Sequence, residues 1–241
     1  MTFETRRETI TSTYFSEGQL VDALGDAMRR VYLWMVIGLF TTAVVAGVVV
    51  NTGLVQVIAS NTLLFIGLIV GELALVIAIT AAIKRISPGT GLLLFFVYSA
   101  LNGATLAVIS LVYTLGSIAL TFFTTATLFG AMSIIGYTTK MDLSRFGSFL
   151  LMGLIGIILA SMANIFLASS ALDWIITFVG IFVFLGLAVY HTQRIKVNTI
   201  AALQSGDEQA VAKVGIVGAL SLYLDFINLF LMLLRLLGRR R

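Results

Sequence analysis

The stretch LYLDFINLFLMLLRLLG, residues 222–238, carries the feature that decides the fold of this chain. It makes up most of an apolar run over 216–237, and about 20 such residues are enough for a helix to cross a bilayer. Asp225 lies near the middle of the run, where a carboxylate costs about 2.5–3.5 kcal/mol on insertion scales. Charges kept at such positions usually handle ions, protons or substrates; the alternative is a satisfied hydrogen bond to a neighbouring helix.

The composition of the whole chain is that of a membrane protein. Hydrophobic residues account for 59% of the sequence and charged residues for 11%, whereas soluble domains carry about 25% charged residues. The net charge of +4 does not indicate nucleic-acid binding, because the basic residues gather at the ends of apolar runs and so report membrane topology. The absence of cysteine excludes disulfides, thiolate metal sites and a cysteine nucleophile.

The apolar runs predict an all-α membrane protein that folds as a seven-transmembrane-helix bundle. Each run has about the length that a helix needs to span the hydrocarbon, and strand-like alternation is absent. We expect one transmembrane domain at 31–238, an N-terminal tail at 1–30 and a basic C-terminal tail at 239–241. The predicted spans cover residues 31–50, 62–83, 91–113, 117–137, 147–168, 172–192 and 216–237.

The distribution of Lys and Arg predicts a cytoplasmic N-terminus. The first, third and fifth loops contain neither residue, whereas the tail and the other loops contain several, and cytoplasmic segments carry the excess of Lys and Arg. Seven full spans then put 239–241 on the outer side; the alternative is a last segment that re-enters and returns to the cytoplasm. The first thirty residues contain no apolar signal sequence, and 17–30 has the pattern of a short amphipathic surface helix.

Glu72 is a second carboxylate inside the apolar runs. Its position in the second predicted helix gives it the depth of Asp225 in the seventh. Two carboxylates at one depth suggest a shared polar site for a proton or a cation, if their helices touch. The alternative is a protonated Glu72 that is bonded to a neighbouring helix. Gly67 and Gly71 form a GxxxG spacing, which predicts that another helix approaches closely beside Glu72.

The seventh predicted helix carries a polar stripe. At about 100° per residue, one arc of roughly 80° contains Ser221, Asp225, Asn228 and Arg235. Tyr223 points the other way. A polar stripe on a membrane helix faces the bundle interior or a water-filled path, so we expect this helix to be central. Arg235 lies about 15 Å along the axis from Asp225 and is expected to reach the interface rather than pair with it.

His191 is the only histidine in the sequence and ends the sixth apolar run. A histidine near a membrane boundary is most often a solvated or packing residue, but it is also the side chain that titrates nearest physiological pH. We expect Asn102 to have a structural, hydrogen-bonding role. The sequence contains no HExxH, P-loop, GxSxG or CxxC motif, so we expect neither an enzyme nor a bound metal or cofactor.

Four segments together resemble the Bax inhibitor-1 family (transmembrane Bax inhibitor motif), and the bacterial inner-membrane branch is the most similar. The resemblance covers nearly the whole chain from the first predicted helix onward, with the segments in the expected order. They are FFVYSALNGATLAVI at 95–109, GYTTKMDLSRFGSFLLMGLIGIILAS at 136–161, VYHTQRI at 189–195 and LYLDFINLFLMLLRLLG at 222–238.

The resemblance implies an inner-membrane bundle of seven helices with the last helix at its centre. It also implies passive, pH-sensitive calcium permeation, in which one aspartate on the sixth helix and one on the seventh share a proton. A basic residue from the end of the second helix latches onto them in the closed state. Some bacterial relatives are instead linked to a membrane-bound AAA+ protease, as substrate or modulator.

Asp225 matches the seventh-helix aspartate of the family. The sixth-helix aspartate normally stands in a Tyr-Asp-Thr-Gln setting, and this chain has His191 in its place. The shared-proton mechanism does not carry over directly, because a carboxylate beside an imidazole favours the charged form of each. Arg85 matches the latch by position, with Lys84 next. By sequence count His191 lies nearer a membrane boundary than Asp225, so the two meet only if their helices extend beyond the predicted runs.

The leading hypothesis is a passive, pH-sensitive leak channel for cations in the bilayer, with calcium as the expected ion. Its ion and proton site is Asp225, which also makes the transient contact with calcium. The alternative is a non-transporting membrane protein that modulates an AAA+ protease or a stress response, and a proton-coupled transporter comes third. Beside Asp225, the residues expected to serve the leak are the titrating His191, the second acid Glu72, and the supporting Arg85, Asn228 and Arg235.

Overall fold

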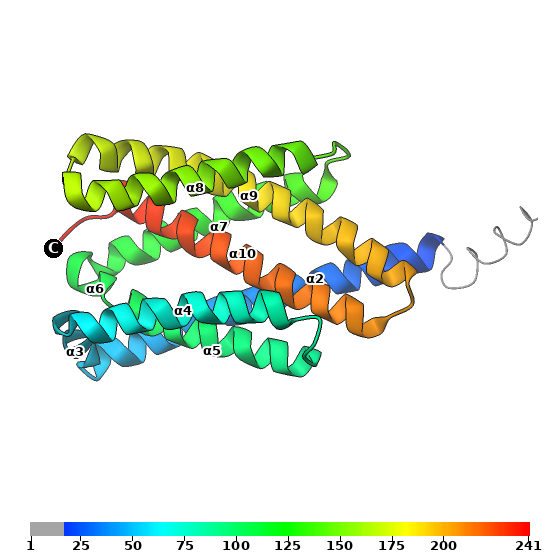
Figure 1. Cartoon of the computed structure of the whole chain (residues 1–241), viewed down its shortest axis with the longest axis horizontal. Coiled ribbons are helices and arrows are strands. Elements are labelled where there is room, and N and C mark those ends of the chain that lie inside the picture. Colours follow the sequence, from blue (N-terminus) through cyan, green and yellow to red (C-terminus); the bar gives the residue numbers. More distant parts are fainter. Residues whose placement is uncertain (1–16) are drawn as a thin grey trace, which may run out of the picture.

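The computed structural model describes residues 17–241, which form an all-α bundle (Figure 1). Residues 1–16 of the predicted tail lie outside the described residues. Within 17–241, seven helical segments are long and apolar enough to cross a membrane, which confirms the predicted fold class. The helices are α2 (Glu17–Asn51), α3 (Leu54–Ser60), α4 (Thr62–Ala82), α5 (Pro88–Leu106), α6 (Ile109–Val112), α7 (Leu115–Thr138), α8 (Ser144–Leu167), α9 (Ser170–Gln204) and α10 (Glu208–Leu237).

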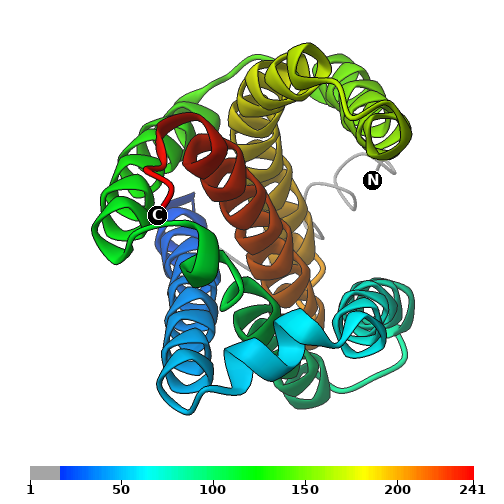
Figure 2. The same cartoon turned by 90° about the vertical axis from the view of Figure 1, so that its left-hand side faces the viewer.

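Helix α10 is the central element, as its polar stripe predicted. It contacts α2, α5, α7 and α9, and Figure 2 shows it passing through the middle of the bundle. Its most apolar stretch is 72% buried, whereas that of the peripheral α4 is only 6% buried. A helix that is apolar on every side, such as α4, can face lipid, whereas the polar residues of α10 need protein neighbours, which explains why α10 occupies the centre.

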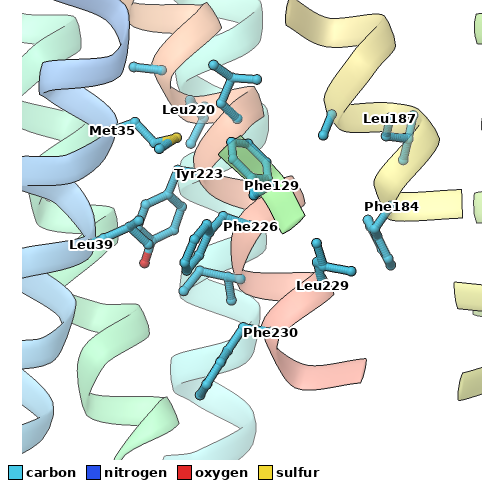
Figure 3. Close-up of a cluster of buried hydrophobic side chains, with 14 of the residues drawn as sticks. Met35, Leu39, Phe129, Phe184, Leu187, Leu220, Tyr223, Phe226, Leu229 and Phe230 are labelled. Carbon is cyan, nitrogen blue, oxygen red and sulfur yellow. The ribbon is translucent and has the colours of Figure 1, made fainter. Parts of the chain in front are cut away.

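Aromatic and aliphatic side chains fill the space around α10 (Figure 3). The ring of Phe226 lies 5.5 Å from that of Phe129 in α7, and the ring of Tyr223 lies 5.7 Å from that of Phe95 in α5. Both pairs meet edge to face, the geometry that the quadrupoles of aromatic rings favour. On the side of the helix that faces α9, Leu229 is buried together with Phe184 and Leu187. This packing fixes the rotation of α10 and therefore the direction of its polar side chains.

The bundle has two distinct ends. The N-terminal end holds the start of α2 and the loops that join α4 to α5, α7 to α8 and α9 to α10; the C-terminal end holds α3, α6 and residues 238–241 (Figure 1). Helix α10 is continuous from one end to the other and does not turn back. The last segment is therefore a full-length helix, as preferred over the re-entrant alternative.

Helices α2, α9 and α10 are longer than the spans that the apolar runs predict, and they project together at the N-terminal end (Figure 1). Helix α2 begins at Glu17, so the separate surface helix predicted at 17–30 is wrong. Leu24 and Met28 are buried in the common core, because this extension packs against those of α9 and α10. The outer faces of these extensions are polar, so hydropathy along the sequence does not reveal that the helices continue.

A tight turn joins α9 to α10 and lets both helices continue past the apolar runs. Gly206 adopts a positive φ of 70°, which the absence of a Cβ permits. The carboxylate of Asp207 accepts hydrogen bonds from the backbone N–H groups of Gln209 and Ala210 at 2.9 and 3.1 Å, and so caps α10. This hairpin sets which residues of α9 and α10 lie opposite one another.

Candidate functional site

His191 and Asp225 form a buried pair at the centre of the bundle. Nδ1 of His191 lies 2.6 Å from Oδ2 of Asp225. Asp225 is 3% exposed and the histidine side chain 24%. The two residues meet because α9 continues to Gln204 and α10 begins at Glu208, which places both well inside the hairpin. A hydrogen bond between Nδ1 and Oδ2 needs a proton on one of the two atoms, so the pair holds at least one proton between its members.

A cavity of about 610 Å³ leads from the N-terminal end to this pair. His191 lines the cavity, and so do the basic side chains of Lys84, Arg194 and Lys213 together with the acidic Asp207. The partial exposure of the imidazole lies on this side of the pair. Protons and ions from the N-terminal end therefore reach His191 before they reach Asp225.

Glu72 is bound by neutral donors from α5. The side-chain amide of Asn102 donates to Oε2 of Glu72 at 2.9 Å, and the hydroxyl of Thr105 donates to Oε1 at 2.5 Å. Glu72 is therefore hydrogen-bonded to a neighbouring helix, which was the alternative to a shared acidic site. Gly67 and Gly71 do not create it, because a Cβ at either position would meet nothing within 4 Å. The GxxxG prediction is therefore wrong.

Tyr223 links the Glu72 site to α2 and α10. Its hydroxyl donates to Oδ1 of Asn102 at 3.0 Å and lies 2.6 Å from Oγ1 of Thr42. Sequence reasoning placed Tyr223 away from the polar stripe and gave it no role. The sequence could have indicated a role for Tyr223, because a tyrosine in the middle of a buried helix needs a hydrogen-bond partner for its hydroxyl.

The two carboxylates do not share one site. Asp225 bonds to α9, whereas Glu72 bonds to α5, and Tyr223 reaches the Glu72 site from a position about 200° around α10 from Asp225. The expected common acid pair is therefore replaced by two polar sites on different sides of the central helix, which we call the His–Asp site (His191, Asp225) and the Glu72 site (Glu72, Asn102, Thr105, Tyr223).

The predicted latch contact is not formed in the described part of the chain. Arg85 is exposed in the loop after α4, and its side chain makes no hydrogen bond or ion pair with residues 17–241. His191 already occupies the bonding position beside Asp225. Lys84, the second choice for the latch, lines the cavity that leads to the pair.

The two remaining predicted residues lie outside the His–Asp site. The side-chain amide of Asn228 donates to the carbonyl of Leu224 in its own helix at 2.8 Å. Arg235 forms an ion pair with Asp173 at 3.6 Å near the C-terminal end, and both side chains are about half exposed. Arg235 therefore reaches away from Asp225, as its axial distance predicted. Sequence reasoning had not considered Asp173, which lies in the first turn of α9.

Known proteins are similar to this chain over nearly its whole length. A family model described as "Inhibitor of apoptosis-promoting Bax1" matches residues 24–241. The chain is 52% identical over 215 residues to "Inner membrane protein YbhL" of Escherichia coli (strain K12), which covers 89% of this chain and 92% of that protein. It is 39% identical over 235 residues to an uncharacterized protein of Rickettsia prowazekii, covering 97% and 98% of the two chains. The matched region includes the His–Asp site and the Glu72 site.

Proposed function

Because this chain is a membrane protein of the Bax inhibitor-1 family, we propose that it is a passive, pH-sensitive cation leak whose expected ion is calcium. The observation that carries the proposal is the buried His191–Asp225 pair at the end of a cavity. A membrane helix retains a costly central carboxylate where it serves ion or proton handling. Here that carboxylate has a titrating partner within hydrogen-bonding distance.

The charge of the pair supplies the pH response. When His191 is protonated, the imidazolium neutralises Asp225 and repels an arriving cation. When His191 loses that proton, the pair carries one net negative charge, which attracts a divalent cation. The leak should therefore rise with pH across the range in which histidine titrates, about pH 5 to 8. Lys84, Arg194 and Lys213 in the cavity add a positive field that opposes entry.

Aromatic packing beyond the pair fits a closed form of the leak. Phe226 and Phe230 follow Asp225 toward the C-terminal end, and both are buried among the rings of α7. Glu72 supplies a second acidic group on the other side of α10, where Asn102 and Thr105 bind it. With the N-terminal end in the cytoplasm, as Lys and Arg predict, the cavity opens toward that compartment.

Reconstitution tests the proposal directly. Wild type and Asp225→Asn would be placed in liposomes that enclose a calcium dye, and the leak measured between about pH 5 and 8. We expect Asp225→Asn to lower the leak by about tenfold or more, equivalent to about 1.4 kcal/mol in the barrier. Asp142→Asn, which removes an exposed carboxylate from the loop after α7, is the matched control. Identical leaks from wild type and Asp225→Asn across this range would refute the proposal.

A second candidate function is a non-transporting role, in which the chain modulates a membrane-bound AAA+ protease. The joint projection of α2, α9 and α10 at the N-terminal end favours it, because it offers a partner a surface beyond the other helices. This function predicts no calcium flux and no effect of Asp225→Asn. Crosslinking in native membranes, with wild type and Asp225→Asn compared, separates it from the leak.

A further inference from the structure

Residues 239–241 are three consecutive arginines held in a fixed place at the C-terminal end. The backbone N–H of Arg241 donates to the carbonyl of Val112 at 2.9 Å, and that of Thr114 donates to the carbonyl of Arg239 at 3.2 Å. The N–H of Arg239 also donates to the hydroxyl of Ser117 at 2.8 Å. This pairing ties the arginines to the connection between α6 and α7, and Figures 1 and 2 show the chain end beside α6.

The three arginine side chains are exposed, and no acidic residue pairs with them. Within residues 17–241, none of their guanidinium groups forms a hydrogen bond or an ion pair. The described loops of the C-terminal end contain no Asp or Glu, and Asp173 nearby is paired with Arg235. Guanidinium groups bind phosphate through paired N–H donors, so such a cluster is suited to an anionic phosphate group.

An apolar cleft of about 330 Å³ lies at the same end of the bundle, between α2, α5, α6, α7 and α10. Its wall on α2 runs from Leu39 to Asn51, about 18 Å along the helix axis at 1.5 Å per residue. Leu115 and Ile118 line it on α7, next to the segment that binds the arginines. The cleft is thus long and apolar, and the arginines, which do not line it, are tied to Thr114, the residue before Leu115 in its wall.

We propose that this cleft holds an acyl chain of an anionic phospholipid whose headgroup phosphate is bound by Arg239, Arg240 and Arg241. Only an amphiphile with one negative end matches an apolar cleft with cations at the same end of the bundle, and the bilayer supplies such a molecule at this depth. Burial of the acyl chain is favourable because it fills space that Leu39, Leu115 and their neighbours otherwise leave empty. The site lies outside the His–Asp site and does not rest on the proposed leak, although Phe230, which packs beyond Asp225, also lines the cleft.

Two variants separate the headgroup from the acyl chain. The triple variant Arg239→Gln, Arg240→Gln, Arg241→Gln removes the charge and leaves the backbone pairing possible. Gly47→Leu fills the cleft, because Gly47 lines it and a Cβ there would meet nothing within 4 Å. Gly156→Leu is the matched control, since its Cβ also meets nothing within 4 Å and Gly156 lies on α8, away from the cleft. Leucine is the better helix former, so both glycine variants should fold.

Native mass spectrometry of the purified full chain, with phosphatidylglycerol or phosphatidylcholine added, tests the proposal. We expect one retained phosphatidylglycerol per chain and weaker retention of phosphatidylcholine. Affinity should fall about fivefold for each arginine replaced and should be lost in Gly47→Leu, while Gly156→Leu matches wild type. A rise in the melting temperature with added phosphatidylglycerol should follow the same order among the variants, and a cooperative melting transition without added lipid shows that each variant is folded.

Three outcomes would overturn this proposal. Equal retention by all four proteins would mean that the lipid only surrounds the bundle. Retention of phosphatidylglycerol by Gly47→Leu as by wild type, with loss only in the triple variant, would mean that the arginines bind the phosphate without any role for the cleft. A dimer that Gly47→Leu abolishes would mean that a second copy of the chain, and not a lipid, fills the cleft.

Discussion

The His–Asp site and the Glu72 site each contain a carboxyl group, and they lie on two sides of the central helix α10. The two carboxyl groups have different bonding partners. Asp225 is bonded to an imidazole at the end of a cavity, whereas Glu72 is bonded to an amide and a hydroxyl. An imidazole is an ionisable group, whereas an amide and a hydroxyl of this kind stay neutral. The two acids therefore lie at similar positions along their helices but differ in whether the bonding partner can itself carry a charge.

The largest expected effect concerns the residue that joins the Glu72 site to the core. Tyr223→Ala removes a fully buried ring and should destabilise the bundle by about 3–5 kcal/mol. Tyr223→Phe keeps the ring and loses only the bonds to Asn102 and Thr42, which should cost about 1 kcal/mol. Thermal unfolding in detergent measures both. Equal losses for the two variants would show that the hydroxyl, and not packing, dominates at this position.

Glu72→Gln should have the next largest effect. Glutamine replaces one of the two acceptor oxygens by an NH2 group, so one of the bonds to Asn102 and Thr105 is lost or reversed in direction, and the bundle should lose up to about 1 kcal/mol. In liposomes we expect the calcium leak to fall by the same factor at every pH, because this site has no titrating partner. A change in the shape of the pH profile would contradict the contrast between the two sites.

The smallest effect is expected from Arg235→Gln. Its ion pair with Asp173 is 3.6 Å long and about half exposed on both sides, and exposed pairs contribute about 0–1 kcal/mol. Unfolding and the pH profile of the leak should both remain close to wild type, and added salt should remove what difference there is. A large decrease in the calcium leak of Arg235→Gln would contradict this expectation and would place Arg235 in the ion path.

The sequence predicts the number of spans and the central position of α10 because both follow from long apolar runs and one polar stripe. It does not predict the lengths of α2, α9 and α10 beyond the apolar runs. Residues such as Leu24 and Ala202 are buried by the neighbouring extensions, and hydropathy alone carries no information about such partners. The same extension resolves why His191, which the sequence count places near a boundary, lies beside Asp225.

The polar sites, like the helices, were predicted only in part. The resemblance to a known family assigned His191 and Asp225 to one site, and the structure brings them together. Sequence reasoning missed Tyr223, because a stripe defined by charged and amide side chains leaves a tyrosine on the other face without a role. It also over-interpreted Gly67 and Gly71, since a GxxxG spacing names no partner helix, and none lies against these glycines.

The most direct test of the central claim is the pH profile of calcium leak in His191→Asn liposomes. Asparagine keeps a hydrogen bond to Asp225 but does not titrate between about pH 5 and 8. We expect the wild-type leak to rise with pH over this range and the His191→Asn leak to stay flat near the wild-type value at high pH. A His191→Asn profile that rises as steeply as that of wild type would contradict the assignment of pH sensing to the His–Asp site.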